Sequence, residues 1–552
     1  MLRRRRRSTF SSSGSIGRVR WLEPVERRRR RRAPVVPILL LLLVLAGAGG
    51  VGYLLLAREQ AADRRQETVE RFAAAWARGD HRAMWRLLTP EGRKDWSSTE
   101  FAASYRIAAE QATVKAVEPG RVADVSGDTA RVPITVRTRD FGALRGTMAF
   151  KLADHDGTLF VEWSPALRLP GLRDGERVRR RVLERTARRP ILAADGSRLE
   201  AISPGLTGTP PGGGEKGSGL EALYDETLGG RPGAELRFGR RIVRKVETKR
   251  GRSIRTTISP SVQRAATEAL GDRLGAVAVM RPDSGRILGL SGIALSGPQP
   301  PGSTFKIITL AGALQHKIAS PSSSYPVQTA ATLSGVKVRN ASDESCGGSL
   351  ANSFAHSCNS VFAPLGAELG ARRLVRLAEA FGFNQRPKLP DAEPSTIPRA
   401  RELKDDLAVG AAAIGQERDL ATALQMASVG ATIGNRGVRV EPKIVGSERA
   451  KRRRVVSRRV AGLVRDMMVG VVRGGTGGAA AVPGVEVAGK TGTAELRPTA
   501  GGPIDPKNTD AWFVAFAPAS QPRVAVAVML VGAGQGGATA APVAREVLGA
   551  AL

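Results

Sequence analysis

Gly302–Leu310 reads GSTFKIITL, follows Pro300-Pro301 directly, and is the most informative segment of the chain. The Pro-Pro-Gly run predicts a loop, and the apolar run after it predicts the start of a helix. Because residues three apart share one face of a helix, the Ser303 hydroxyl and the Lys306 amine can meet there. Burial disfavours the charged form of a lysine. A neutral Lys306 would accept the proton of Ser303 and make this serine a nucleophile.

Two later motifs raise the value of this pair, because Ser-x-x-Lys by itself often occurs by chance. Ser357-Cys358-Asn359 follows after about fifty residues. Lys490-Thr491-Gly492-Thr493 comes last, and the alternating valines of residues 485–489 before it predict a strand. Taken alone, Ser357 is also consistent with a helix N-cap, and Lys-Thr-Gly with an ordinary strand-to-turn transition. All three motifs in this order are improbable by chance.

The three motifs give residues Ser253 to Leu552 a resemblance to the transpeptidase domain of penicillin-binding proteins, which has a serine β-lactamase-like fold. The resemblance implies that Ser303 attacks a peptide carbonyl and forms an acyl-enzyme, with Lys306 as the general base. It also implies that Ser357 relays a proton to the leaving amine. Asn359 would orient Lys306 and hold an amide of the substrate.

The same resemblance assigns roles to the third motif. Lys490 would complete the catalytic group and, with Thr491 or Thr493, bind the terminal carboxylate of the substrate. The backbone N–H groups of Ser303 and Thr493 would form the oxyanion hole, and such donors are typically worth roughly 3 kcal/mol each. Gly492 would let the backbone of the substrate approach this strand closely, because it has no side chain.

Histidine and metal chemistry have little support in this sequence. The chain has four histidines and two cysteines, and none of the histidines lies in a motif suited to a catalytic triad. His356 lies beside Ser357, but neighbouring residues on a helix face different ways. Lysine is therefore the better candidate for the base, and we expect neither a metal site nor a cofactor.

The two cysteines, Cys346 and Cys358, lie twelve positions apart. In an exported domain they would meet a compartment that can be oxidising. A disulfide between them would close a short loop next to Ser357 and stabilise the fold by about 3 kcal/mol through its effect on the unfolded chain. Two free buried thiols are an equal alternative at this point.

The N-terminus combines a basic tail with an apolar segment. Residues 1–32 are rich in arginine, which is typical of a disordered tail that can contact anionic lipids. Residues 33–57 carry no charge, and at ~1.5 Å per residue they extend roughly 37 Å, enough for one transmembrane helix. Because Arg27–Arg32 precedes this segment, the positive-inside rule places the N-terminus in the cytoplasm and everything after Arg58 outside the cell membrane. A cleaved signal peptide or a buried helix is the alternative.

Residues 58–175 predict a small α+β roll. Apolar residues at helical spacing predict helices over Glu67–Trp76 and Asp80–Leu88. Strand-like stretches follow, which gives an antiparallel sheet after the helices; they cover residues 114–117, 130–137, 146–152 and 158–163. Trp76–Asp80 and Phe160–Pro165 carry a resemblance to the nuclear transport factor 2-like (NTF2-like) domain of some low-affinity penicillin-binding proteins. We expect a spacer or docking role for this domain, since it shows no catalytic set.

Residues 176–252 resemble the linker or dimerisation domain of class B penicillin-binding proteins. The likeness rests on Arg189–Ser197, Gly219–Asp225 and Leu228–Gly233. The predicted fold class is therefore a multidomain α+β protein. It begins with a transmembrane helix, continues with the small roll and the linker domain, and ends with the transpeptidase domain over residues 253–552.

These resemblances imply a membrane-anchored D,D-transpeptidase that cross-links peptidoglycan stem peptides and that β-lactams such as penicillin acylate at Ser303. The alternatives are a serine β-lactamase or D,D-carboxypeptidase, and a non-catalytic β-lactam sensor. Other cell-wall synthesis or division proteins are expected partners. The formal net charge of +34 would favour nucleic acids. We expect no nucleic-acid partner, because much of this charge lies in the tail and an exported basic domain suits the anionic polymers of a cell wall.

Overall fold

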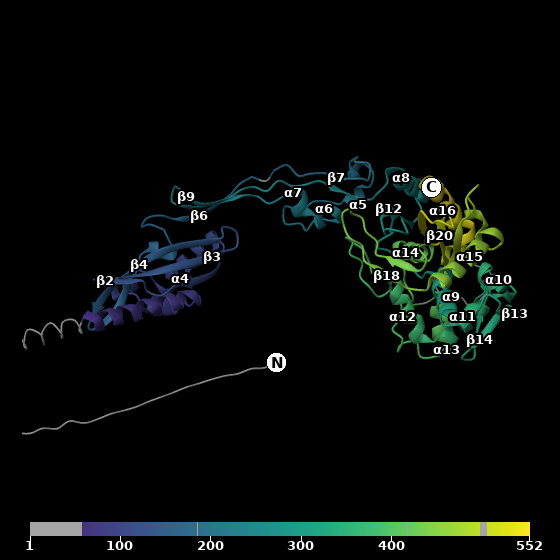
Figure 1. Ribbon diagram of the computed structural model, residues 1–552, viewed down its shortest axis with the longest axis horizontal. Coiled ribbons are helices and arrows are strands. Elements are labelled where there is room, and N and C mark those ends of the chain that lie inside the picture. Colours follow the sequence, from purple (N-terminus) through teal and green to yellow (C-terminus); the bar gives the residue numbers. More distant parts are fainter. Residues whose placement is uncertain (1–57, 185, 417, 497–504) are drawn as a thin grey trace, which may run out of the picture. The chain divides into compact units, whose positions relative to one another are not determined.

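The computed structural model of the chain describes residues 58–184, 186–416, 418–496 and 505–552 (Figure 1). These residues form two compact units, one that ends at Arg180 and includes Leu236–Arg244, and one of Arg181–Glu235 with Lys245–Leu552. The predicted basic tail and transmembrane segment, residues 1–57, lie outside the described residues. Within the described ranges, every helix is too short or too polar to cross a membrane.

The first unit contains the predicted helices and antiparallel sheet. Residues 58–77 are helical, and further helices follow: α2 (His81–Arg86), α3 (Pro90–Asp95) and α4 (Ser98–Ala112). The sheet has the order β1-β3-β4-β5, with β2 paired to β3. Its strands are β1 (Val114–Pro119), β2 (Asp124–Ser126), β3 (Thr129–Thr138), β4 (Ala143–His155) and β5 (Thr158–Glu162). The prediction of helices followed by a sheet is confirmed, although α3, α4 and β2 were not predicted.

The core of the first unit explains this arrangement. Alternate residues of β3 are buried, so one face of the sheet packs inward. Phe72 and Phe150 meet there edge to face, with ring centroids 5.8 Å apart. The start of α4 is set by a capping box, in which Ser97 and Glu100 each bond the backbone of the other.

Short elements connect this sheet with the larger fold. Strands β6 (Val178–Val182), β8 (Ala234–Phe238) and β9 (Arg241–Val246) form a three-stranded sheet. Strand β7 (Ile191–Leu192) pairs in parallel with β10 (Ile254–Arg255). The helices of this region are α5 (Pro204–Thr207), α6 (Gly219–Leu223) and α7 (Asp225–Gly229).

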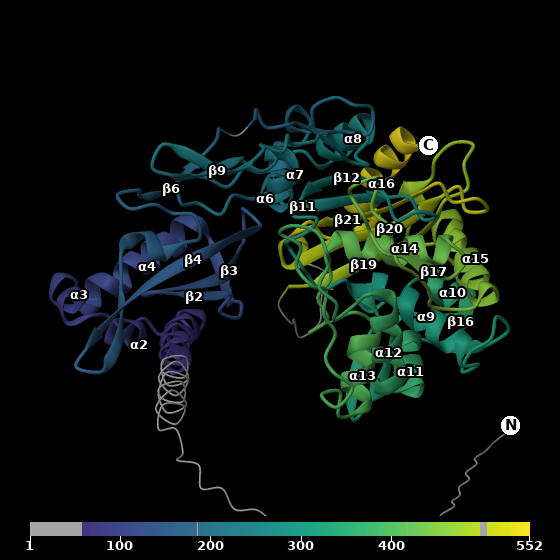
Figure 2. The same cartoon turned by 60° about the vertical axis from the view of Figure 1, so that its left-hand side comes forward.

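The second unit is built on a five-stranded antiparallel sheet with the order β12-β11-β21-β20-β19. Its strands are β11 (Gly275–Met280), β12 (Ile287–Gly292), β19 (Ala488–Glu495), β20 (Thr509–Ala517) and β21 (Val524–Leu530). Helices α8 (Pro260–Leu270) and α16 (Gly536–Ala551) cover one face and α14 (Ala423–Gly434) the other (Figure 2). Because both faces are covered, every residue of β20 and β21 is buried. Strand β19 lies at an edge and carries the Lys-Thr-Gly motif.

A mainly helical region packs beside this sheet. It contains α9 (Lys306–Gln315), α10 (Leu350–Ala355), α11 (Asn359–Leu369), α12 (Ala371–Phe381), α13 (Asp406–Ala413) and α15 (Arg458–Gly474). Two small hairpins pair β13 (Ser324–Gln328) with β16 (Cys346–Ser349), and β14 (Ala330–Leu333) with β15 (Val336–Arg339). The predicted strand over residues 485–489 is wrong at its start, because β19 begins only at Ala488. Val485 forms an isolated bridge with Val482 instead.

Candidate active site

Ser303 lies on a tight turn that the sheet edge holds in place. The predicted helix begins with a 3-10 turn, Gly302–Phe305, and Lys306 is the first residue of α9. Gly302 has a φ of +51°, and a Cβ atom there would lie 2.6 Å from the carbonyl oxygen of Thr493. Only glycine fits this close approach. The turn that carries Ser303 therefore lies directly against the strand of the third motif.

Lys306 is fully buried and connects the first motif with the second. Its Nζ donates to Asn359 Oδ1 at 2.6 Å and to the Ser357 carbonyl oxygen at 2.7 Å, and it also reaches Ser357 Oγ at 3.3 Å. Burial lowers the pKa of Lys306 well below its ordinary value, and the nearby positive charge of Lys490 lowers it further. This lowered pKa favours the neutral amine, which is the form that a general base must have.

Ser357 occupies an unusual backbone position between α10 and α11. Its φ is +62°, in the left-handed region. Cys358, not Ser357, is the N-cap residue of α11, so the helix-cap interpretation of Ser357 is wrong. Half-buried in this turn, the Ser357 hydroxyl accepts a hydrogen bond from Lys490 Nζ at 2.9 Å as well as the longer one from Lys306.

Lys490 is the second buried lysine of the cluster. Burial lowers its pKa to about 7. Besides Ser357, its Nζ contacts the carbonyl oxygen of Thr491 at 3.0 Å. The ring of Phe354 lies 5.5 Å from Lys490 Nζ, and that of Phe362 lies 5.7 Å from Lys306 Nζ. These aromatic walls exclude water from the amines while still favouring some positive charge.

The orientation of Asn359 is set by its neighbours. Its Nδ2 donates to the Arg339 carbonyl oxygen at 2.9 Å, which turns Oδ1 towards Lys306.

Asn340, which follows Arg339 in the chain, is buried, and both the oxygen and the nitrogen of its side-chain amide form hydrogen bonds. Its Oδ1 accepts from Ser360 N, and its Nδ2 donates to the carbonyl oxygens of Gln328 and Glu344, each at 2.8 Å. Sequence reasoning missed Asn340, because it lies in no motif.

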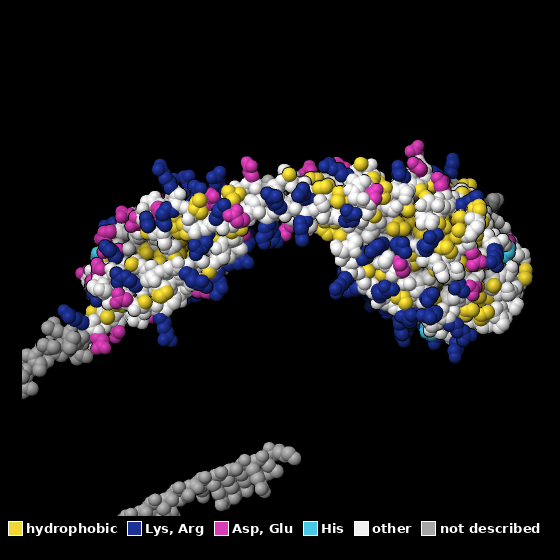
Figure 3. Space-filling view, turned by 45° about the horizontal axis from the view of Figure 1, so that its top comes forward, with side chains coloured by type: hydrophobic (Ala, Val, Ile, Leu, Met, Phe, Trp, Pro, Cys, Tyr) yellow, Lys and Arg dark blue, Asp and Glu magenta, His cyan; other side chains and the backbone are white. Residues whose placement is uncertain are grey.

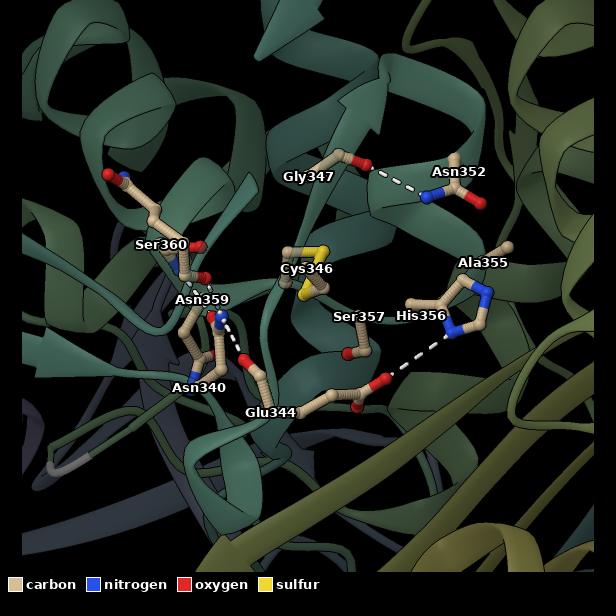
Figure 4. Close-up of a disulfide and its surroundings, with 12 residues drawn as sticks. Asn340, Glu344, Cys346, Gly347, Asn352, Ala355, His356, Ser357, Asn359 and Ser360 are labelled. Carbon is tan, nitrogen blue, oxygen red and sulfur yellow. Dashed lines mark hydrogen bonds and ion pairs between the residues drawn. A yellow bond between two sulfur atoms is a disulfide. The ribbon is translucent and has the colours of Figure 1, made fainter. Parts of the chain in front are cut away.

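Cys346 and Cys358 form a disulfide, so the alternative of two free thiols is wrong (Figure 4). The bond joins β16 to the residue between Ser357 and Asn359. His356 lies on the other side of Ser357, and its Nδ1 is 3.6 Å from Glu344 Oε1. The turn that carries the Ser357 hydroxyl is therefore tied to the preceding loop on both sides.

The edge strand β19 presents the third motif. Thr491 Oγ1 lies 2.6 Å from the hydroxyl of Thr476, a residue of the glycine-rich run Gly474–Gly478. Thr493 Oγ1 accepts from Gly536 N at 3.4 Å, and its carbonyl oxygen accepts from Gln416 Nε2 at 3.4 Å. Sequence reasoning did not select Thr476, although its place in a glycine-rich turn was a usable signal.

Gly492 has a different neighbour from the one expected. A Cβ atom at this position would lie 2.8 Å from Thr304 Cγ2, 2.8 Å from Trp512 Cβ and 2.9 Å from the Pro301 carbonyl oxygen. The missing side chain makes room for the turn that carries Ser303. In this structure Gly492 thus serves the packing of the site, and its expected contact with substrate stays a prediction.

Hydrogen bonds join four of the predicted catalytic residues into one cluster: Lys306, Ser357, Asn359 and Lys490. Ser303, the fifth, lies on the 3-10 turn that leads directly into Lys306. Within the described part of the chain, no hydrogen bond joins the Ser303 hydroxyl to either lysine. Catalytic hydrogen bonds are often long in the absence of substrate, so this geometry does not oppose a proton transfer. A serine beside two buried lysines, one with a pKa near 7, is equipped for acyl transfer.

Two family models match the chain. The model described as the penicillin binding protein transpeptidase domain matches residues 275–549. The model described as the NTF2-like N-terminal transpeptidase domain matches residues 64–176. Together they include the catalytic cluster and the sheet of the first unit.

Curated and solved proteins agree with these models. Peptidoglycan D,D-transpeptidase PbpA of Mycolicibacterium smegmatis is 34% identical over 413 residues, which cover 61% of this chain and 80% of the relative. The D,D-transpeptidase domain of a peptidoglycan glycosyltransferase from Eggerthella lenta is 30% identical, with a TM-score of 0.58 and coverage of 67% of this chain and 99% of that one. The imipenem acyl-enzyme of penicillin-binding protein A from M. tuberculosis is 28% identical, with a TM-score of 0.56 and coverage of 66% and 98%.

Proposed function

Because the chain belongs to the family of penicillin-binding protein transpeptidases, we propose that it is a serine D,D-transpeptidase that cross-links peptidoglycan stem peptides. The observation that carries this proposal is the pair of buried lysines that share the Ser357 hydroxyl beside Ser303. The donor is a stem peptide ending in D-Ala-D-Ala. β-Lactams mimic this donor and acylate the same serine; the M. tuberculosis relative forms an acyl-enzyme complex with imipenem.

In the acylation step, neutral Lys306 takes the proton of Ser303, and Ser303 Oγ bonds to the donor carbonyl carbon. As the tetrahedral intermediate collapses, the bond to the last D-Ala breaks. The leaving amine then receives a proton through Ser357, whose hydroxyl lies within hydrogen-bonding distance of both lysines. An amine on a neighbouring stem peptide then attacks the acyl carbon and loses a proton to the same cluster. As the bond from this carbon to Ser303 Oγ breaks, the cluster returns the proton to Ser303 Oγ.

The backbone of β19 is suited to stabilise the oxyanion of this intermediate. The Thr493 carbonyl oxygen accepts from Gln416, so it points away from the partner strand β20. In an antiparallel strand the N–H and C=O groups of one residue point to the same side. The Thr493 N–H therefore faces the turn of Ser303, whose own N–H would be the second donor. Lys490 and the hydroxyls of Thr491 and Thr493 are proposed to bind the terminal carboxylate.

The cellular placement is a separate part of the proposal. We propose a single-pass protein of the cell membrane, with the basic tail inside and the described residues outside. The uncharged segment of residues 33–57 after Arg27–Arg32 supports this topology. The substrate lies outside the membrane, so the enzyme must reach it there, in company with other proteins of cell-wall synthesis or division.

The decisive experiment labels the full-length protein with a fluorescent penicillin and sequences the labelled peptide. We expect the label on Ser303, no label on Ser303→Ala, and a normal label on Ser520→Ala, a control at an exposed position on the β20–β21 turn. Equal labelling of a folded Ser303→Ala protein would refute the nucleophile. Rapid release of hydrolysed penicillin would favour a β-lactamase, and release of D-Ala without cross-linking would favour a carboxypeptidase.

A further inference from the structure

A cavity of about 660 Å³ lies in the second unit and shares no lining residue with the catalytic cluster. Its main wall is Arg252–Thr257 together with Ser259. Ala194 and Thr227 line it from the linker segment, and Arg281, Arg286 and Val445–Ser447 line it from the larger fold. Both parts of the second unit therefore contribute to one hollow.

The charge of this lining is of one sign. Its charged members are Arg252, Arg255, Arg281 and Arg286, and no aspartate or glutamate lines the cavity. Arg281 has a carboxylate partner, since its Nε lies 3.3 Å from Asp283 Oδ1. Across the described ranges, the other three guanidinium groups form no ion pair.

Asp195, which follows the lining residue Ala194, has hydrogen-bond partners of its own. The pKa of Asp195 is lowered chiefly by hydrogen bonds from Ser197, and the charge of Arg255 contributes least to this shift. Arg255 itself donates one hydrogen bond, to the Ala194 carbonyl oxygen at 3.3 Å. Most of its donors, and those of Arg252 and Arg286, remain available to an occupant of the cavity.

The walls are held by backbone hydrogen bonds. Thr257 N donates to the Ile444 carbonyl oxygen at 2.7 Å, and Gly446 N donates to that of Arg255 at 3.3 Å. Ser259 N donates to the Leu288 carbonyl oxygen at 2.8 Å. These bonds join the strand that carries Arg255 to the segments that carry Arg286 and Ser447, so the cavity is a built part of the fold.

We propose that this cavity binds a phosphate-bearing anion. A guanidinium group donates two parallel hydrogen bonds to a phosphate, which gives both energy and geometric specificity. Unpaired cations that share one cavity repel one another, and a multivalent anion neutralises more than one of them at once. Pyrophosphate and phosphodiester groups have this property. An occupant would bridge the linker segment and the larger fold, and would therefore stabilise the second unit.

The test is titration calorimetry of the full-length protein with inorganic pyrophosphate at ~0.15 M salt. Combining Arg252→Gln, Arg255→Gln and Arg286→Gln should weaken binding about 100-fold, because hydrogen bonds between charged groups are strong. The matched control combines Arg372→Gln, Arg373→Gln and Arg376→Gln on the exposed face of α12. It removes the same charge and should leave binding unchanged.

The control is essential because Lys and Arg side chains are spread over the face shown in Figure 3. Equal losses in the two triple variants, or no binding by the wild type, would overturn the proposal. Citrate that binds as tightly as pyrophosphate would overturn the phosphate assignment. Nanodiscs with phosphatidylglycerol that displace pyrophosphate would identify a lipid headgroup as the source, and pyrophosphate binding that they do not disturb would identify a soluble phosphate. The triple variant of Arg252, Arg255 and Arg286 should still be labelled by penicillin as strongly as the wild type. Loss of pyrophosphate binding can then be told apart from loss of the proposed transpeptidase function.

Discussion

Lys490 Nζ donates a hydrogen bond to Ser357 Oγ over 2.9 Å, between residues 133 positions apart in the chain. Lys306 approaches the same hydroxyl at 3.3 Å. Two buried amines that share one acceptor influence each other, because a charge on one raises the cost of a charge on the other. The apparent pKa values of acylation therefore belong to the lysine pair rather than to either residue.

Lys490→Gln should move the rising limb of the acylation rate to higher pH. Acylation needs a neutral base, so the rate rises with pH as the pair loses its proton. Burial lowers the pKa of Lys306 most, and Lys490 adds to this effect. Removing Lys490 removes that addition, so the pKa of Lys306 rises. The measurement is the penicillin acylation rate from about pH 5 to 10, scaled to its plateau.

Lys404→Gln is the matched control, since Lys404 is exposed and its substitution removes the same charge. It should leave the limb in place. An unchanged rising limb in Lys490→Gln would contradict the coupling between the two lysines.

The burial of Lys490 also affects stability. Its pKa in the folded state, about 7, lies below its ordinary value of 10.5. The folded state then binds fewer protons than the unfolded state, so Lys490 makes the free energy of unfolding rise with pH between these two values.

Asn340→Ala should lower both stability and acylation. The substitution leaves the Ser360 N–H and the carbonyl oxygens of Gln328 and Glu344 without their partner. The bond to Ser360 is buried and the other two are partly buried. A fully buried group that loses its hydrogen bond costs about 1–3 kcal/mol, and a partly buried group costs less. We expect the free energy of unfolding to fall by about 3 kcal/mol in denaturant titration, and the penicillin acylation rate to fall because the start of α11 carries Asn359.

Asn352→Ala is the control for this loop. Asn352 is exposed, and its side chain donates one hydrogen bond, to the Gly347 carbonyl oxygen at 2.8 Å. Loss of this hydrogen bond should lower the free energy of unfolding by less than about 1 kcal/mol and leave the acylation rate unchanged. Comparable effects of the two substitutions would mean that Asn340 has no special positioning role.

Replacing both cysteines by serine should lower the free energy of unfolding by about 3 kcal/mol, because the disulfide closes a short loop in the unfolded chain. Acylation should also slow, since Cys358 lies beside Ser357. Thermal unfolding with and without a reducing agent provides the check. The chain has two cysteines, so the reducing agent should destabilise the wild type and have no effect on the double variant. Equal stability of the two proteins under oxidising conditions would contradict this prediction.

The topology proposal predicts where reporters fused to the chain are active. A reporter that works only outside the cytoplasm should be active after Leu552, and one that works only inside should be silent there. The physical reason is the cost of moving Arg27–Arg32 across the bilayer. The same reporters fused after Arg32, before the apolar segment, should give the opposite pattern. A reversed result would separate the enzyme from its proposed substrate.

Local sequence patterns determined a good part of this protein. The motifs selected Ser303, Lys306 and the residues around Ser357 and Lys490, because acyl transfer restricts which residue types can act. Alternating and helical periodicities placed the sheet and first helices of the first unit, since they follow from backbone geometry. The early start expected for the strand at residues 485–489 failed, because alternating valines do not say where a partner strand ends.

Other properties depend on residues that are distant in the chain and that packing brings together. The low pKa values of Lys306 and Lys490 arise from burial among aromatic rings of other helices, which no spacing encodes. The role of Gly492 depends on Thr304 and Trp512, which packing alone brings beside it. The same holds for Asn340 and for the arginine-lined cavity. The local sequence sets the preference of each segment for helix, strand or turn. Distances between side chains, exclusion of water and unpaired charges arise only when the segments pack together.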